Sequence, residues 1–564
     1  MRKKELVFAF IAFVLACFLT IALFTGCDVI ASTLASAAET TTAVETSTGE
    51  ITKPEETTTS LAANLPKTGG ILRIHIYEPV SLDPQNITES EGTQIARQIW
   101  DGLFTYDPVT LETKSKLCEK YEISNNGLVY TFYIKKGVKF HSGKELKAQD
   151  FVYSWTRLVL KDTAARLAYL LSPVEGFEEC QDGSSTELKG LKALDDYSFQ
   201  ITLKYPYADF LNILGDVVFY PVSKDSIEKA GDKASEIPDG TGPFKFIKWE
   251  HDQNVELVRN DDYYGQKPYL DGVKYIIIPD EQTAFLEFQA GNFEYVTIPM
   301  ENINAVKADP QWKDGVIIHS VPVLYYFVIN LDAKPFKGNL LLREAIGLMI
   351  DRQNICDILS KGVDVPATGF VPPGISGFQE NAMGYIFSLE VAKAKLKEAG
   401  YPEGKGLSTL KLGYIAGSGN EKIAQAVQAD AANIGIKIET EELDLGAMKQ
   451  KTKSGEIIFY GRSWQADYPA MDNFLYPLFY SQSPDNYSSY NNPEADRLLI
   501  EARSIADQAS REAKYREIEK LVLKDAAFVP VYFYGTRKII QPYVRGFILD
   551  NMGNYDLAAV WLDK

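Results

Sequence analysis

Histidine and cysteine are scarce in this 564-residue chain, and their scarcity argues against several kinds of active site. The four histidines have neither HxxxH nor HExxH spacing, so the sequence gives little support to a metal site. No CxxC occurs among the five cysteines, and no GxSxG occurs, so two common enzyme signatures are missing. Catalytic groups can still assemble from distant positions, and a secreted hydrolase therefore stays open as an alternative.

Basic residues are also outnumbered, with 58 Lys and Arg against 76 Asp and Glu and a formal net charge of −18. Contacts to nucleic-acid phosphates need basic surfaces, so we expect no nucleic-acid partner. The same balance argues against binding anionic lipid by charge alone. The aromatic share of 12% is high, and it indicates either large ligand-contacting surfaces or an aromatic core.

One long hydrophobic run lies at the N-terminus. A basic start at residues 2–4 precedes an apolar run at 6–24, and the sequence FTGC at 24–27 closes it. This resembles a secretory signal with a lipobox, which predicts a signal peptide at 1–26 and lipidation of Cys27. The alternative is an uncleaved transmembrane anchor. Both interpretations place the rest of the chain outside the cytoplasmic membrane.

The segment after this run is rich in Thr, Ala and Glu, and residues 36–70 contain no aromatic side chain. Such a segment buries too little apolar surface to offset the entropy of ordering it. We therefore predict a disordered tether at 27–69 and a folded body from Gly70 onward. A chain of this length predicts two to four domains.

The first half of the body shows mixed periodicities. A Gly-rich stretch at 240–246 lacks the GxxxxGK[ST] spacing and leads into strands, so it is not a phosphate-binding loop. Two-residue alternation and apolar runs predict strands, and three- to four-residue spacing predicts helices. The strands are expected at 71–76, 128–134, 197–203, 244–249, 255–259 and 275–279, and the helices at 91–103, 149–160 and 281–291.

From about Val323 strands and helices alternate, which predicts an α/β domain with a largely parallel sheet. The strands are expected at 324–331, 410–414, 436–439, 457–460 and 529–534, and the helices at 341–359, 391–399, 421–434 and across most of 493–525.

One short stretch concentrates polar recognition groups. The strand at 457–460 breaks at Gly461 and is followed by Arg462, Trp464, Asp467 and Tyr468. A carboxylate among rings and an arginine favours a site for a small cationic or zwitterionic ligand. The alternative is structural, with Asp467 capping a helix that starts near residue 469.

Several ordered segments together resemble one family, the extracytoplasmic solute-binding proteins of peptide ABC importers (oligopeptide/dipeptide-binding, solute-binding protein family 5). The longest is YTFYIKKGVKFHSGKELKAQDFVYSW at 130–155, with an aromatic strand, a basic turn and a following helix. The others are SLDP at 81–84, GTGPF at 240–244, NDDYY at 260–264, LREA at 342–345 and FVPVYFY at 528–534. The correspondence runs from about Gly70 to the end.

The resemblance implies an α/β, two-lobed periplasmic-binding-protein-like fold (type II, large cluster with an extra inserted domain) and a ligand cleft between the lobes. The first lobe would combine 70–100, 226–322 and 536–564, with an inserted domain at 101–225. The second lobe would be 323–535. Crossovers near residues 100, 323 and 535 would form a hinge that lets the lobes close around ligand.

The resemblance also implies how ligand is held, through backbone pairing with strand edges and an acidic anchor in a WxADY segment. Asp467 would then meet the ligand ammonium. Around it, Trp464 would line a side-chain pocket, Ser463 and Gln465 would offer main-chain hydrogen bonds, Ser90 and Glu89 would lie on the opposite strand edge, and Tyr534, Tyr326, Arg97 and Tyr169 would wall the cavity.

The arginine that often meets the ligand carboxylate in this family falls at Gly461 here, one residue before Arg462. The implied function is a substrate-binding lipoprotein, without cofactor or enzymatic activity, that delivers short peptides to a permease and ATPase complex. It would be a monomer held outside the cell membrane or in the periplasm. The alternative within the fold is another solute, namely an oligosaccharide, a nickel complex or haem.

Overall fold

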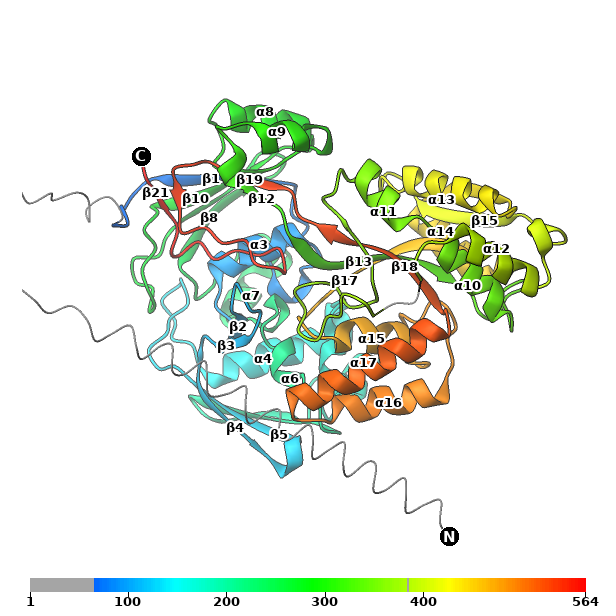
Figure 1. The fold of residues 1–564 in the computed structure, drawn as a ribbon. Helices are drawn as coiled ribbons and strands as arrows, with labels where there is room; N and C mark the ends of the chain where they lie inside the picture. Colours follow the sequence, from blue (N-terminus) through cyan, green and yellow to red (C-terminus); the bar gives the residue numbers. More distant parts are fainter. Residues whose placement is uncertain (1–64, 383–384) are drawn as a thin grey trace, which may run out of the picture. The chain divides into compact units, whose positions relative to one another are not determined.

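A computed structural model describes residues 65–382 and 385–564 (Figure 1). The predicted signal peptide, Cys27 and most of the predicted tether lie outside these residues. The folded body begins slightly before Gly70, because Lys67 pairs with Asp563 at 2.8 Å and the Gly69 N–H donates to the Tyr269 carbonyl. No helix within the described ranges is long and apolar enough to span a bilayer.

A seven-stranded sheet forms the first lobe, in the order β12-β19-β11-β1-β10-β9-β8. The strands are β1 (Ile71–Ile76), β8 (Phe244–Glu250), β9 (Asn254–Arg259), β10 (Gly272–Ile277), β11 (Tyr295–Thr297), β12 (Val316–Ile317) and β19 (Lys538–Ile540). β1 is parallel to β10 and β11, and the outer pairs are antiparallel. The helices α3 (Ser90–Ile99), α7 (Lys224–Ala230), α8 (Glu281–Gln289) and α9 (Ile303–Ala308) belong to this lobe.

The inserted domain is built on a four-stranded antiparallel sheet in the order β4-β5-β7-β6. The strands are β4 (Cys118–Ser124), β5 (Val129–Ile134), β6 (Leu191–Asp195) and β7 (Ser198–Thr202), and β2 (Phe104–Tyr106) pairs with β3 (Thr113–Ser115) beside them. Helix α4 (Ala148–Val159) packs Trp155 against Phe132 and Phe199. The core of this domain also takes in Tyr468 and Ala470 from the second lobe, so the insertion contacts both lobes.

The second lobe contains a six-stranded sheet in the order β14-β18-β13-β17-β15-β16. The strands are β13 (Ser320–Ile329), β14 (Val365–Pro366), β15 (Leu410–Ile415), β16 (Ile438–Leu443), β17 (Phe459–Gln465) and β18 (Phe528–Gly535). Only β15 pairs in parallel, with β16 and β17, so the prediction of a largely parallel sheet is wrong. The chain enters the lobe along β13 and leaves it along β18. These two neighbouring strands therefore run in opposite directions.

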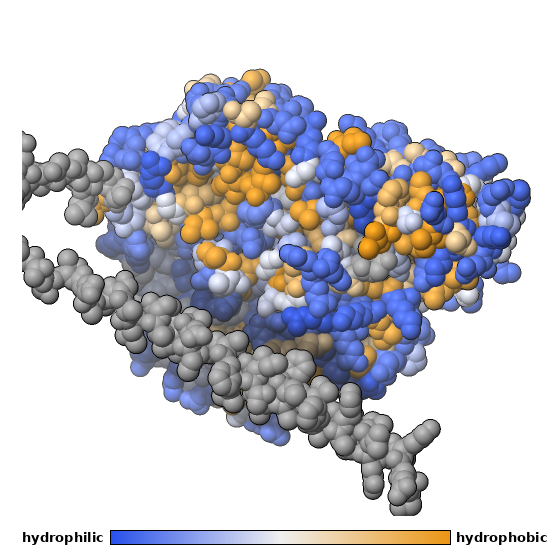
Figure 2. Space-filling model, in the orientation of Figure 1, coloured by the Kyte–Doolittle hydropathy of each residue, from blue (hydrophilic) through white to orange (hydrophobic). Residues whose placement is uncertain are grey.

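Helices cover the second-lobe sheet (Figure 1). They are α10 (Leu340–Met349), α12 (Leu389–Glu398), α13 (Glu421–Asn433), α14 (Leu445–Ser454), α15 (Asp472–Phe479), α16 (Pro493–Arg503) and α17 (Gln508–Lys524). The single helix predicted at 341–359 is interrupted after Met349, because Asp351 accepts from the Asn354 N–H and starts a new turn. Polar residues cover most of the face in Figure 2, with apolar patches between them, which is ordinary for a folded protein.

Candidate ligand-binding site

Strand β17 carries the predicted recognition stretch into the middle of the second-lobe sheet. It pairs with β13 along its whole length, from Phe459 to Gln465. It pairs with β15 only at Phe459 and Tyr460. The opposite edge of β17 over residues 461–465 therefore pairs with no strand in the described part of the chain. An unpaired edge of this kind is a template for an added strand.

Asp467 lies two residues after the end of this free edge, and its side chain is 6% exposed. Oδ2 accepts a hydrogen bond from the Tyr169 hydroxyl at 2.5 Å, and Oδ1 lies 3.2 Å from the Arg166 guanidinium. The Asp467 N–H donates to Asn473 Oδ1 at 2.9 Å, which fixes the turn. Burial raises the pKa of Asp467, while the Arg166 charge and the Tyr169 hydroxyl act in the opposite direction.

The helix-capping interpretation of Asp467 is wrong. Helix α15 begins at Asp472, and Met471 stands at its N-cap without a side-chain cap. Both oxygens of Asp467 instead point to the inserted domain, which supplies Tyr169 and Arg166. Tyr169 was predicted from the family resemblance, whereas Arg166 was not, because no local pattern links two residues 301 positions apart.

A second carboxyl group, Asp216, belongs to the same electrostatic environment. Burial raises its pKa to about 7, the neighbouring Asp467 charge adds to the rise, and Arg166 and Arg97 oppose it. Asp216 also accepts the Val218 N–H at 2.9 Å. Sequence reasoning missed this residue, since it stands in an irregular stretch without a motif. Arg97 was predicted as part of the wall, and the structure brings it within electrostatic reach of Asp216.

Tyrosines line the face of the sheet that carries Ser463. The Ser463 hydroxyl lies 3.1 Å from the Tyr534 hydroxyl, and Tyr534 contacts Tyr532 with ring centroids 5.0 Å apart. Tyr532 in turn stacks on Tyr325 at 5.1 Å. A Cβ atom at Gly461 would lie 2.0 Å from the Tyr325 hydroxyl oxygen, so this phenol occupies the space of a side chain at 461. The arginine expected there is therefore replaced by an aromatic wall.

The other predicted residues of this lobe take different positions. Trp464 is partly buried against the second-lobe core, and Gln465 is exposed. The Arg462 guanidinium lies 3.7 Å above the Tyr487 ring. Tyr326 is fully buried and meets Phe528 edge to face at 5.1 Å. The prediction that Tyr326 helps to wall the cavity is therefore wrong for this conformation, because its side chain points into the core.

Glu89 and Ser90 stand at the N-terminus of α3, so their placement on a strand edge was wrong. The Glu89 carboxylate accepts the N–H groups of Gly92 at 3.0 Å and of Val80 and Thr88 at 3.1 Å. An acidic side chain at this position satisfies the free N–H groups of the first helical turn. These residues therefore begin a helix rather than form a strand. Ser90 is the exposed first residue of the helix.

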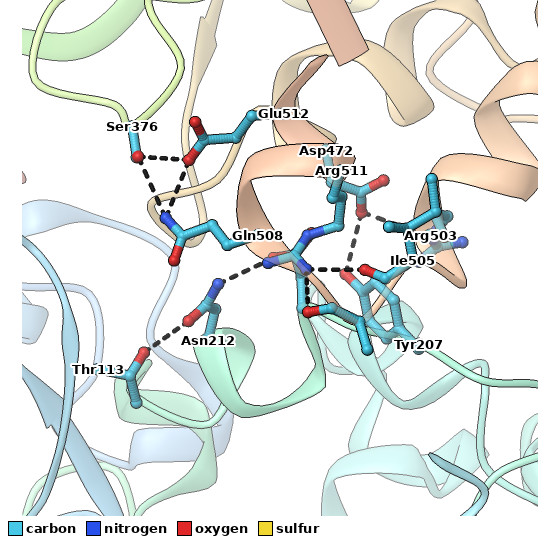
Figure 3. A network of polar contacts seen from close by, with 12 residues as sticks. Thr113, Tyr207, Asn212, Ser376, Asp472, Arg503, Ile505, Gln508, Arg511 and Glu512 are labelled. Carbon is cyan, nitrogen blue, oxygen red and sulfur yellow. Dashed lines mark hydrogen bonds and ion pairs between the residues drawn. The ribbon is translucent and has the colours of Figure 1, made fainter. Parts of the chain in front are cut away.

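A different carboxylate, Asp472, joins the inserted domain to the second lobe (Figure 3). Asp472 is fully buried and accepts hydrogen bonds from Tyr515 and Tyr468, both at 2.7 Å. The Tyr207 hydroxyl lies 3.0 Å from Asp472, and Arg503 forms an ion pair with it at 3.4 Å. No motif in the sequence marks this network, because its members come from four separate segments.

One cavity of about 350 Å³ lies elsewhere, between the first lobe and the inserted domain. It is lined by Lys116, Lys135, Tyr263, Tyr264 and Ile548, among others, and by none of the predicted ligand-binding residues. We place the candidate site at Asp467 because the free strand edge and the buried carboxylate meet there. Within residues 65–382 and 385–564, no three His, Cys, Asp or Glu side chains gather as metal ligands.

Two α/β lobes joined by crossing strands, with an extra domain inserted in the first, define the class of extracytoplasmic solute-binding proteins. Residues 112–486 match the family described as bacterial extracellular solute-binding proteins, family 5 (middle part), and the chain belongs to this family. Its members serve peptide ABC transporters, and the relatives named below are binding proteins rather than enzymes.

Relatives with different ligands resemble the chain to a similar degree. The oligopeptide-binding protein OppA of Bacillus subtilis is 28% identical over 494 residues, which cover 84% of this chain and 89% of OppA. Heme-binding protein A of Haemophilus influenzae is 28% identical over 499 residues, covering 85% and 89%. The solved structure of DppA from Helicobacter pylori in complex with the peptide STSA has a TM-score of 0.72 and 30% identity, covering 88% of this chain and 99% of DppA.

Proposed function

We propose that this protein captures short peptides by their free amino terminus at Asp467 and delivers them to a membrane permease. The observation that carries the proposal is the free edge of β17 at 461–465, which leads directly to a buried carboxylate. A ligand strand along this edge would place its ammonium next to Asp467. Main-chain pairing gives affinity without reading side chains, which suits a carrier of varied peptides.

The neighbouring residues have matching roles in this proposal. Tyr169 holds Asp467 in place through its hydroxyl. Ser463 and Gln465 offer main-chain groups, and Trp464 and Tyr534 contribute ring surface beside the edge. Five residues of strand span about 17 Å, which is long enough for a ligand segment of four or five residues. The Arg462 guanidinium on β17 would be available to pair with a ligand carboxylate or an acidic side chain.

Lipidation of Cys27 would keep the folded body at the outer face of the membrane, and residues 28–66 would act as its tether. A tether lets the binding protein sample the surrounding space while it stays close to its permease. Globomycin, which blocks lipoprotein signal cleavage, should cause accumulation of the precursor, and Cys27→Ala should abolish the incorporation of radiolabelled palmitate. A wild-type chain whose size is unchanged by globomycin and which incorporates no label would instead indicate the uncleaved anchor.

The peptide proposal is tested by isothermal titration calorimetry with one four-residue peptide in free and N-acetylated form. We expect stoichiometric binding of the free peptide and at least about a hundredfold weaker binding of the acetylated one, since a buried carboxylate would lose its charge partner. Equal binding of both forms would contradict the ammonium contact. Glu442→Gln is the matched control for a neutralising change at Asp467. It removes an exposed carboxylate on β16 of the same lobe and should bind the free peptide like the wild type.

Haem is the competing ligand class, because one relative is a haem-binding protein. A thermal-shift comparison of peptide, haem and oligosaccharide separates these classes. If haem alone raised the melting temperature and no peptide did, the protein would be a haem-binding protein instead.

A further inference from the structure

Arg166 holds an unusual position for an arginine that pairs with a buried carboxylate. One Nη atom lies 3.2 Å from Asp467 Oδ1, and this is the guanidinium's one hydrogen bond within the described residues. The side chain nevertheless remains 57% exposed. A guanidinium carries five N–H donors, so most of its donors face solvent or an arriving ligand.

A ligand ammonium can bind Asp467 without displacing Arg166. A carboxylate offers about four acceptor positions, and the side chains of Tyr169 and Arg166 use two of them. The ammonium would then lie within about 6 Å of the Arg166 guanidinium, the sum of two hydrogen-bond lengths of about 3 Å. An acidic side chain on the first ligand residue spans this distance.

Arg166 is the positive charge that opposes Asp467, whereas Arg97 faces Asp550 and Asp556 as well as Asp216. An acidic group on the ligand would therefore be attracted by Arg166, and a second basic group would be repelled by it.

We propose that Arg166 makes the ammonium site selective for ligands that carry an acidic group beside their amino terminus, such as peptides that begin with Asp or Glu. This inference rests on the proposed peptide-binding function and names the ligand class that the site favours. Arg166 acts as a specificity-determining residue that attracts the acidic group, while Asp467 supplies the common contact for every free amino terminus.

The test uses three peptides, Xaa-Ala-Ala-Ala with Glu, Gln or Lys as the first residue, titrated into the wild type and Arg166→Gln. The wild type should bind the Glu peptide most tightly and the Lys peptide least tightly, with about a fivefold step per unit of charge for an exposed guanidinium. In Arg166→Gln the Lys peptide should gain affinity, the Glu peptide should lose affinity, and the steps should shrink below about twofold.

Two further variants separate the local contact from net charge. Lys161→Gln removes a positive charge from the same segment, where Lys161 bonds the Asp182 carbonyl, and it should keep the wild-type order. Arg166→Lys should also keep that order, because the charge stays. The same order and steps in wild type and Arg166→Gln would overturn the inference and leave the peptide function intact. Failure of all three peptides to bind the wild type would contradict both this inference and the proposed peptide-binding function.

Discussion

Two carboxylates five residues apart, Asp467 and Asp472, meet the inserted domain in opposite ways. Asp472 is fully buried, with three tyrosine hydroxyls and Arg503 around it. Asp467 has one tyrosine and a half-exposed arginine. A carboxylate whose acceptors are filled from inside the protein serves the fold. One that keeps free acceptors beside an open strand edge is available to a ligand.

The largest expected effect separates the two carboxylates by stability. Asp472→Asn leaves the Arg503 charge buried without its partner, so the free energy of unfolding should fall by about 3–5 kcal/mol. Urea denaturation followed by circular dichroism measures this loss. Asp444→Asn, a change at an exposed helix N-cap of the same lobe, should cost less than about 1 kcal/mol, because Asn caps a helix as well as Asp and only the charge–dipole contribution is lost. Equal losses for the two variants would show that the Asp472 network adds little.

Asp467→Asn should weaken peptide binding and leave stability nearly unchanged, the opposite of what we expect for Asp472→Asn. We expect stability to stay within about 1 kcal/mol of the wild type, because burial already disfavours the ionised carboxyl and an amide can still accept from Tyr169. Peptide affinity should fall at least about a hundredfold, as removal of one partner of a charge pair predicts. Calorimetry and urea denaturation on the same preparation measure both quantities. Retained affinity would show that Asp467 does not bind the ligand ammonium.

Acid should weaken peptide binding through the carboxyl groups of the candidate site. Ligand binding favours ionised Asp467 and Asp216, and burial raises both pKa values, so protons compete with the ligand above the usual carboxyl range. The ligand's α-amino group becomes protonated near pH 8 and must be charged to bind. Affinity should therefore fall as pH decreases from about 7, where that group is already charged. Asp216→Asn should remove the part of this dependence near pH 7. Affinity that is constant from pH 8 to 5 would exclude both linkages.

The smallest effect is expected from Tyr169→Phe. The Tyr169 hydroxyl stabilises the ionised form of Asp467, so its removal should raise the Asp467 pKa further. At neutral pH, affinity should fall by about threefold to tenfold, the value of one hydrogen bond. The part of the binding–pH profile that comes from Asp467 should also move to higher pH. Tyr534→Phe, which removes a hydroxyl from the aromatic wall instead, should leave that profile in place.

Local patterns predicted the elements better than their edges. The apolar run at 457–460 predicts β17, but the strand continues to Gln465, because pairing with β13 overrides the polar composition after Gly461. Glu89 was assigned to a strand edge, although it caps α3. Tyr326 was assigned to the cavity, although strand alternation turns it into the core. Each error came from a contact with a distant segment or from the competition between cap and strand.

The centre of the candidate site was accessible from sequence, but its electrostatic environment was not. Asp467 stands in a compact WxADY segment, and family resemblance singled it out. Arg166 and Asp216 have no motif, and they lie near Asp467 because contacts such as the Tyr207–Tyr468 and Tyr207–Asp472 hydrogen bonds hold the inserted domain against the second lobe. Charge balance at such a site depends on packing between segments far apart in sequence, which composition and periodicity do not encode.

The position of β19 has a consequence for biosynthesis. This strand lies between β11 and β12 in the sheet that β1 begins, so a strand far along the chain completes a sheet that the first strand of the folded body starts. A chain that is still emerging from a ribosome or a translocation pore lacks this strand, and the long sequence separation delays closure of the sheet. The first lobe therefore remains incomplete until β19 has emerged.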